Sequence, residues 1–215
     1  MEMGYNQYGE IVKYQTIIRI SLLVYGMWIG EKMDLRQIKT KNALCSAFLE
    51  LRAHKELSKI TIKELCELAQ VSKATFYLHY RDIYDLSDCL IESTMRAVAE
   101  QICHPEWILS APKKFSNELI CALKSQDSMI RILFSGLKES LLPRTLEKEM
   151  KKRLYVEWPR LRSDAQWNML LTFLVMGGYY TYYRYSRMYS EKMVTDSINH
   201  MVDILCEDFG LGEKE

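Results

Sequence analysis

The sequence predicts an all-α protein, and three observations support this prediction. Apolar residues recur at the spacing of one helix face in several segments after residue 34, and no segment alternates apolar with polar residues as a half-buried strand does. The 215 residues include only 9 glycines and 4 prolines, so long helices can run without a break. The chain is 48% hydrophobic and 27% charged, which is typical of a folded globular protein.

The first half of the chain contains four predicted helices. An apolar stripe on one face indicates the first helix and consists of Leu44, Ala47, Phe48 and Leu51. The same spacing indicates a second, shorter helix and is made by Ile62, Leu65, Cys66 and Ala69. A third short helix fits residues 72–78. A fourth begins near Asp82, whose carboxylate can cap it, and runs to about Cys103.

The second half of the chain is predicted to form five further helices, at about 112–124, 127–136, 140–156, 163–188 and 192–209. Pro143 suits a first helical turn, and Pro159 predicts a break after Trp158. Apolar residues in the last helix step by four and three positions, which is the spacing of a seam between two helices. Together with Gly178, where two helices can approach closely, they are the predicted interface of a homodimer: Val194, Ile198, Met201 and Leu205.

Residues 61–81, which read TIKELCELAQVSKATFYLHYR, carry the pattern of a helix-turn-helix. Thr61 and Glu64 are spaced as a capping box, in which each side chain binds the backbone N–H of the other residue. Only residues 70–72 separate the second helix from the third, which is the length of a helix-turn-helix turn. Ser72 can cap the third helix. The next apolar positions, Phe76 and Tyr80, are expected to point inward with Leu44, Phe48 and Leu65.

The outer face of the third helix suits contact with DNA. Small, hydroxyl-bearing or basic side chains remain there, namely Lys73, Ala74, Thr75, Tyr77 and His79. The start of such a helix can enter the major groove, while Tyr77 and His79 can donate hydrogen bonds to phosphate oxygens. Residues 36–81 contain nine basic and four acidic side chains, although the net charge of the whole chain is only +1. This local positive charge favours double-stranded DNA as a partner.

Residues 36–90 resemble the DNA-binding domain of the TetR (tetracycline-repressor) family. The resemblance is carried by the run ITIKELCELAQVSKATFYLHYRDIYDL and by the segment ALCSAFLEL before it. It implies base-reading positions at Ser72, Lys73, Ala74 and Thr75. It implies phosphate-contacting positions at Thr61, Lys63, Tyr77 and His79.

Three residues depart from the pattern of that family. Gln70 stands at a turn position where the family often has glycine. Leu78 stands where many members carry a polar or a larger aromatic residue. Ile83 stands where many have a lysine, and losing that lysine removes one expected phosphate contact. We therefore expect the affinity for an operator to be modest, whereas the fold should be retained.

The resemblance implies a regulator with two domains, a helix-turn-helix DNA-binding domain at residues 34–82 and a helical effector-binding and dimerisation domain at residues 83–215. A homodimeric repressor of this type holds two recognition helices about 34–36 Å apart on a palindromic operator, and a small-molecule effector releases it. The alternative is a TetR-like coactivator that acts through a protein partner, such as a metabolic enzyme subunit. The apolar residues Leu78 and Ile83 leave this alternative open.

Residues 1–32 form a doubtful N-terminal extension, and Met33 is an alternative start of translation. Within it, the apolar segment 17–29 contains Arg19 and is shorter than the about 20 residues that span a bilayer. The sequence therefore does not predict membrane association, and we expect a cytoplasmic protein. The sequence lacks GxGxxG, P-loop, HExxH and GxSxG motifs, and its six cysteines are too far apart for a zinc-binding CxxC pair. We expect no enzymatic activity, no cofactor and no metal.

Overall fold

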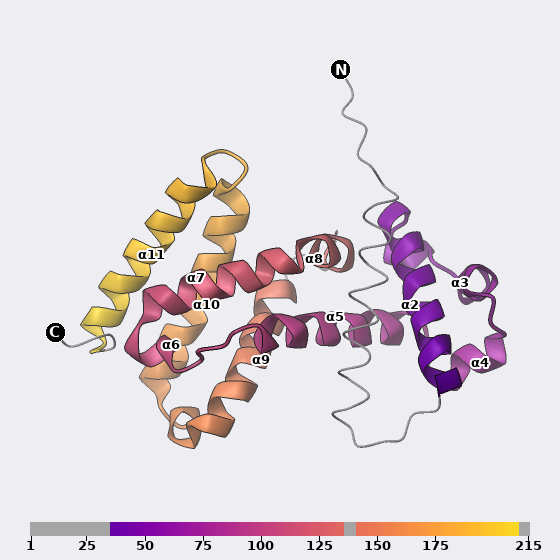
Figure 1. Ribbon diagram of the computed structural model, residues 1–215, viewed down its shortest axis with the longest axis horizontal. Coiled ribbons are helices and arrows are strands. Elements are labelled where there is room, and N and C mark those ends of the chain that lie inside the picture. The colour runs from indigo at the N-terminus through magenta and orange to yellow at the C-terminus, as the bar shows by residue number, and fades with distance from the viewer. Residues whose placement is uncertain (1–34, 136–140, 211–215) are drawn as a thin grey trace. The chain divides into compact units, whose positions relative to one another are not determined.

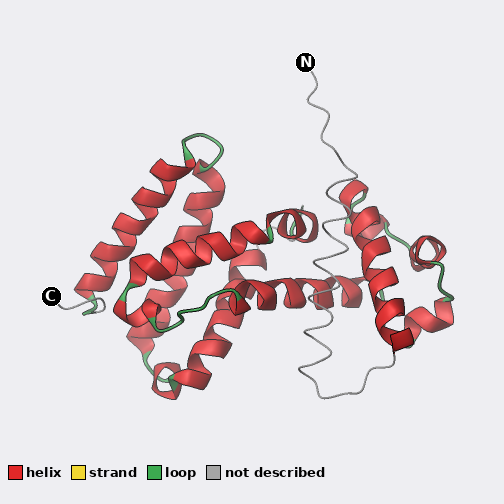
Figure 2. Cartoon of the chain, viewed as in Figure 1, coloured by secondary structure: helices red, strands yellow, loops and turns green. Residues whose placement is uncertain are grey.

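The computed structural model describes residues 35–135 and 141–210. Within these ranges every regular element is a helix, and none is a strand (Figure 2). The predicted all-α class is therefore confirmed. The predicted extension at residues 1–32 and the alternative start at Met33 lie outside the described residues. Among the described helices, none combines the length and the hydropathy needed to cross a lipid bilayer.

The chain forms two compact units. Of the described residues, unit 1 contains 35–94 and 128–135, and unit 2 contains 95–127 and 141–210. Helix α5 (Ile83–Glu100) has residues in both units. These units are defined by compactness, so the functional boundary expected between residues 82 and 83 stays a prediction.

Unit 1 is built on helix α2 (Leu35–His54), which packs against α3 (Ile62–Ala69); α3 in turn contacts α4 (Lys73–Tyr77) (Figure 1). A short 3₁₀ helix, η1 (Leu57–Lys59), precedes α3, and the first part of α5 and most of α8 (Asp127–Leu133) complete the unit. The five side chains expected to point inward are all buried, which confirms that prediction for Leu44, Phe48, Leu65, Phe76 and Tyr80.

Arg52, near the end of α2, is buried and binds two backbone carbonyl groups. The sequence pattern did not predict this role. The Nη1 of Arg52 donates to the backbone oxygen of Lys55 and its Nη2 donates to that of Ser135, both at 2.9 Å. These hydrogen bonds offset much of the free-energy cost of removing the guanidinium group from water. They also attach the segment after α8 to the helix-turn-helix region of the same unit.

The predicted capping box at the start of α3 is half formed. The Thr61 hydroxyl accepts a hydrogen bond from the backbone N–H of Glu64 at 3.2 Å, as expected for an N-cap. The Glu64 carboxylate, however, accepts from the ammonium group of Lys55 instead of reaching back to the cap. The ammonium group of Lys55 thus takes the place of the Thr61 backbone N–H, which is the donor that the capping-box pattern predicts for Glu64.

The turn between α3 and α4 depends on Gln70, which has a φ of 56° and a ψ of 38°. In this left-handed conformation Val71 donates its N–H to the oxygen of Cys66 at 3.0 Å, and Gln70 donates its own to the oxygen of Glu67 at 3.3 Å, so two carbonyl groups near the end of α3 are satisfied. A side chain at positive φ is strained, whereas glycine adopts it readily. This geometry explains why glycine is the residue expected at this position.

Unit 2 contains six further elements, and their order along the chain is α6 (Trp107–Ser110), α7 (Pro112–Ser125), α9 (Leu141–Glu157), η3 (Pro159–Arg162), α10 (Ala165–Tyr185) and α11 (Glu191–Asp208). Helix α11 packs against α7 and α10, and α10 packs against α9 (Figure 1). The five helices predicted in the second half of the chain, which include α8 of unit 1, are present with boundaries shifted by a few residues. The short helices α6 and η3 were not predicted.

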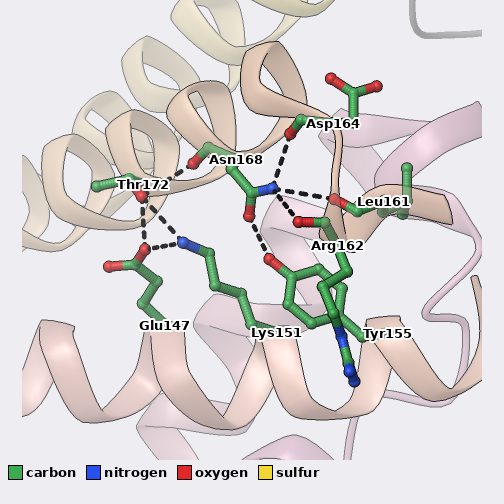
Figure 3. Close-up of polar contacts among 8 residues, drawn as sticks. All are labelled: Glu147, Lys151, Tyr155, Leu161, Arg162, Asp164, Asn168 and Thr172. Atoms are coloured by element: carbon green, nitrogen blue, oxygen red, sulfur yellow. Dashed lines mark hydrogen bonds and ion pairs between the residues drawn. The ribbon is translucent and has the colours of Figure 1, made fainter. Parts of the chain in front are cut away.

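Polar side chains join α9 to α10 across one side of their contact (Figure 3). The carboxylate of Glu147 accepts hydrogen bonds from the Thr172 hydroxyl and, at 2.6 Å, from the Lys151 ammonium group. Burial alone would raise the pKa of Glu147, but these two donors outweigh it and hold the pKa below its ordinary value. The carboxylate therefore stays ionised at neutral pH and continues to link the two helices.

Asn168 makes a second link in the same region. Its side-chain oxygen accepts from the Tyr155 hydroxyl of α9, and its amide nitrogen donates to the backbone oxygens of Leu161 and Asp164 at 3.0 and 2.7 Å (Figure 3). Asp164 itself caps α10 by accepting from the N–H of Trp167 at 3.0 Å. The turn from η3 into α10 is therefore held by side chains at both of its ends.

The predicted homodimer seam has to be corrected, because part of it lies inside the chain. Val194 and Ile198 are each only 4% exposed and belong to a core cluster with Val202 and Cys206. Gly178 faces the same core, since a Cβ at this position would lie 4.0 Å from Cγ2 of Ile198. The seam spacing is the same whether the second helix is in the same chain or in a partner. Only Met201, exposed, and Leu205, partly exposed, remain on the surface.

Replacing Gln70 by glycine should stabilise unit 1. Glycine removes the strain of the left-handed conformation, and we expect the free energy of unfolding to rise by about 1 kcal/mol. Urea unfolding followed by circular dichroism measures this change. The matched control is Gln37→Gly at an exposed position in α2, where glycine should lower the stability. An unchanged or lower stability for the Gln70 variant would contradict the assigned strain.

Candidate nucleic-acid interface

Helix α4 is held in place by a side-chain cap at its N-terminus and by one buried ring. The Ser72 hydroxyl accepts from the N–H of Thr75 at 3.0 Å, and the two hydroxyl oxygens are 2.8 Å apart. Phe76 has no exposed surface, and its ring centroid lies 5.5 Å from that of Tyr77 and 5.8 Å from that of Tyr80. The five-residue helix therefore has one face anchored in the core and the other turned outward.

The structure brings the predicted contact residues to the outer side of the helix-turn-helix. Lys73 and Ala74 are exposed, Tyr77 is 57% exposed, and Thr75 and His79 are partly buried. The remaining three predicted residues, Thr61, Lys63 and Ser72, are exposed at the starts of α3 and α4. All eight belong to unit 1, so their placement rests on one compact body.

Several of the basic side chains counted in the sequence are paired with acidic ones. Lys55 pairs with Glu64, and the others pair at 3.7 Å (Lys59 with Glu56), 3.9 Å (Lys63 with Glu67) and 2.9 Å (Arg81 with Asp85). The local positive charge is therefore partly neutralised within the fold. Both groups of the Lys63–Glu67 pair are largely exposed, and such a pair contributes at most about 1 kcal/mol, so Lys63 can exchange its partner for a phosphate.

The histidine among the predicted contact residues is His79. Burial, together with the positive charge of Lys41, lowers the pKa of its imidazole below the ordinary value. The ring is therefore neutral at pH 7 in the isolated protein, with one ring nitrogen as a donor and the other as an acceptor. An anion placed beside it would favour the protonated form, which has two donors.

The two apolar departures, Leu78 and Ile83, differ in where they point. Ile83, the first residue of α5, is 5% exposed and packs into the core, while Asp82 beside it caps the helix by accepting from the N–H of Asp85 at 2.8 Å. Leu78 is 81% exposed at the end of α4. Sequence reasoning treated them alike because both are apolar, and an apolar residue type alone does not fix whether a side chain faces the core.

One curated protein is similar to the chain. No family model matches the chain. Over 120 residues, which are 55% of this chain, it is 32% identical to an uncharacterized HTH-type transcriptional regulator of Bacillus subtilis (strain 168), YxbF. The aligned region is 29% of the length of that protein. The chain is therefore similar, over about half of its length, to a helix-turn-helix regulator.

Proposed function

We propose that the chain is a DNA-binding transcriptional regulator of the TetR type, which places α4 in the major groove. The observation that carries the proposal is the division of α4 into a fully buried face at Phe76 and an outer face with Lys73, Ala74 and Tyr77 exposed. Similarity to an HTH-type regulator supports it. Ser72, Lys73, Ala74 and Thr75 are the proposed base-reading residues.

Four further residues are the proposed phosphate contacts: Thr61, Lys63, Tyr77 and His79. The Thr61 hydroxyl accepts from the Glu64 N–H and therefore can still donate its own proton to a phosphate oxygen. The exposed phenol of Tyr77 and the ammonium group of Lys63 are donors of the same kind. Contacts to phosphate position the protein, whereas contacts to base edges decide the sequence.

Selection of genomic DNA fragments by the purified full-length chain, at two salt concentrations, tests this function. We expect a short palindrome for which the affinity of the chain falls with salt. A plot of the logarithm of the binding constant against the logarithm of the salt concentration should have a slope of about −0.9 for each phosphate neutralised.

Lys73→Ala should relax the sequence preference. Tyr77→Phe should weaken binding to every sequence by about 1 kcal/mol, because one hydrogen bond is lost. Tyr189→Phe, at an exposed position in unit 2, is the matched control and should have no effect.

Recovery of no DNA above background would contradict the proposed function. It would favour the coactivator alternative, in which the chain acts through a protein partner such as a metabolic enzyme subunit. Burial of Ile83 weakens that alternative, because only Leu78 of the two apolar departures is left to contact a partner.

The proposed contact of His79 predicts a pH dependence of DNA binding. The pKa of the free imidazole is lowered, and a phosphate beside the imidazolium would raise it in the complex. Binding then takes up a proton, so affinity should increase as the pH falls through the pKa that the imidazole has in the complex, and it should level off below the pKa of the free protein. Because a charged hydrogen bond is stronger, we expect a gain of about fivefold per half-site. The measurement is a titration of labelled operator at several pH values; His79→Gln should abolish the gain.

A palindromic operator requires two recognition helices, and we infer that the chain forms a homodimer through the outer face of α10. This face carries the exposed side chains Met169, Phe173 and Tyr180. Gly177 lies between them, exposed, and a Cβ there would meet nothing within 4 Å. We place two α10 helices antiparallel, with the two-fold axis midway between residues 173 and 177. Each Phe173 side chain then faces the open space beside Gly177 of the other copy. Large and small residues are then complementary by symmetry.

Gly177→Leu should dissociate this homodimer, because the new side chain occupies the gap that receives Phe173. The monomer should remain folded and its helix should be stabilised by about 1 kcal/mol, since leucine has the higher helix propensity. Sedimentation equilibrium measures the dissociation constant, and circular dichroism measures the fold. Gly178→Ala, which faces the core with a 4.0 Å contact, is the matched control and should stay dimeric. An unchanged dissociation constant for Gly177→Leu would show that the interface lies elsewhere.

The proposed effector site is a cavity of about 90 Å³ inside unit 2. Apolar side chains of five helices dominate its lining, among them Ile108 of α6, Phe115 of α7, Met150 of α9, Leu171 of α10 and Ile198 of α11. Hydroxyl-bearing Ser116, Tyr179 and Tyr182 also line it, which favours a small, largely apolar molecule. An effector releases a repressor only in so far as it binds the DNA-free state more tightly. Loss of operator binding on addition of such compounds is the measurement that checks this role.

A further inference from the structure

We propose that Leu78 recognises the 5-methyl group of a thymine in the operator and thereby contributes to sequence specificity. This inference rests on the proposed function and deepens it, because Leu78 is not among the residues to which a base contact was assigned. Leu78 is 81% exposed, the highest fraction among the large apolar side chains that the structure describes as exposed. A single exposed leucine is ordinary on a protein surface, so its position has to carry the argument.

Leu78 continues the outer face of α4. Its backbone is helical, with φ of −70° and ψ of −21°, and its N–H donates to the oxygen of Ala74 at 3.2 Å. Residues four positions apart in a helix lie on the same side, so Leu78 follows Ala74 as Tyr77 follows Lys73. The outer face of α4 therefore has an apolar row, Ala74 and Leu78, beside a polar row, Lys73 and Tyr77.

The exposure of Leu78 is imposed by its neighbours. Phe76 and Tyr80, two positions before and after it, are both buried in the core of unit 1. Leu78 would have to displace one of these rings to become buried. The fold therefore holds an apolar side chain outward at the end of the helix proposed to enter the groove.

The chemistry of the major groove supplies a matching partner. Thymine presents a methyl group there, cytosine presents an amino donor at the neighbouring position, and apolar side chains select the methyl group. A protein partner would need a larger apolar surface than the one that Leu78 and the half-exposed ring of Tyr77 form together. The row beside Leu78 instead carries the ammonium group of Lys73 and the phenol of Tyr77, which suit a nucleic acid.

The test replaces thymine by deoxyuridine, which removes the methyl group and leaves the base pair unchanged. The full-length chain first selects its preferred duplex from random DNA. Each thymine of that duplex is then replaced symmetrically in both half-sites, and dissociation constants are measured. We expect one thymine position at which the wild-type chain loses about fourfold in affinity per half-site, the effect of returning one methyl group to water.

Variants of Leu78 connect that loss to this residue. Leu78→Ala should bind the thymine duplex about fourfold more weakly per half-site and should no longer distinguish thymine from deoxyuridine. Leu78→Met keeps an apolar side chain of similar reach and should retain the distinction. The matched control is Leu68→Ala, at an exposed leucine of α3, which should behave like the wild-type chain.

The outcomes separate this inference from the function on which it rests. A selected palindrome that tolerates deoxyuridine at every position, or a deoxyuridine effect that persists in Leu78→Ala, would overturn the role of Leu78 and leave the regulator intact. Failure of the wild-type chain to select any DNA would overturn the proposed function and this inference with it. Because Leu78 makes no contribution to the core, circular dichroism of Leu78→Ala should match that of the wild-type chain.

Discussion

The burial of Phe76 is the interaction on which the rest of unit 1 depends. Helix α4 has five residues, far fewer than the about 12 that a helix needs to be even marginally stable in water. Its conformation is therefore set by tertiary packing: α4 packs against α3, and Phe76 and Tyr80 are buried, as are Leu44 and Phe48 of α2 and Leu65 of α3. This anchoring decides which side chains face outward, so the core of the unit determines the composition of the candidate interface.

An equivalent division governs α10 in unit 2. Gly177 and Gly178 are adjacent in sequence, yet one is exposed with open space around it and the other lies against Ile198. Thr172 and Asn168 link α10 to α9 (Figure 3). These links favour one rotation of α10 about its axis, in which the two neighbouring glycines have different surroundings. The tyrosines after them divide in the same way, with Tyr179 and Tyr182 lining the inner cavity and Tyr180 exposed.

Sequence reasoning predicted the helix-turn-helix well because its signals are local. A cap at Thr61, a turn at Gln70 and inward rings at Phe76 and Tyr80 depend on neighbours within a few positions, and the structure has all of them. Signals that depend on distant partners failed. The seam through Val194 and Ile198 has the same spacing in a monomer core as in a dimer, and the partner of Arg52 lies 83 positions away. The DNA contacts, the dimer and the effector remain predictions.

The bond from Arg52 to Ser135 has a consequence for how the gene can be divided. Unit 1 is discontinuous, because the chain leaves it after residue 94 and returns to it at residue 128. A fragment that stopped after the helix-turn-helix would lose α8 and the Ser135 carbonyl group, and it would leave one side of a buried guanidinium without its acceptor. Recombination could exchange the second half of the gene at the apparent domain boundary. The incoming segment would then have to supply another acceptor for the Arg52 guanidinium group. The helix-turn-helix and the returning segment are constrained to be inherited together.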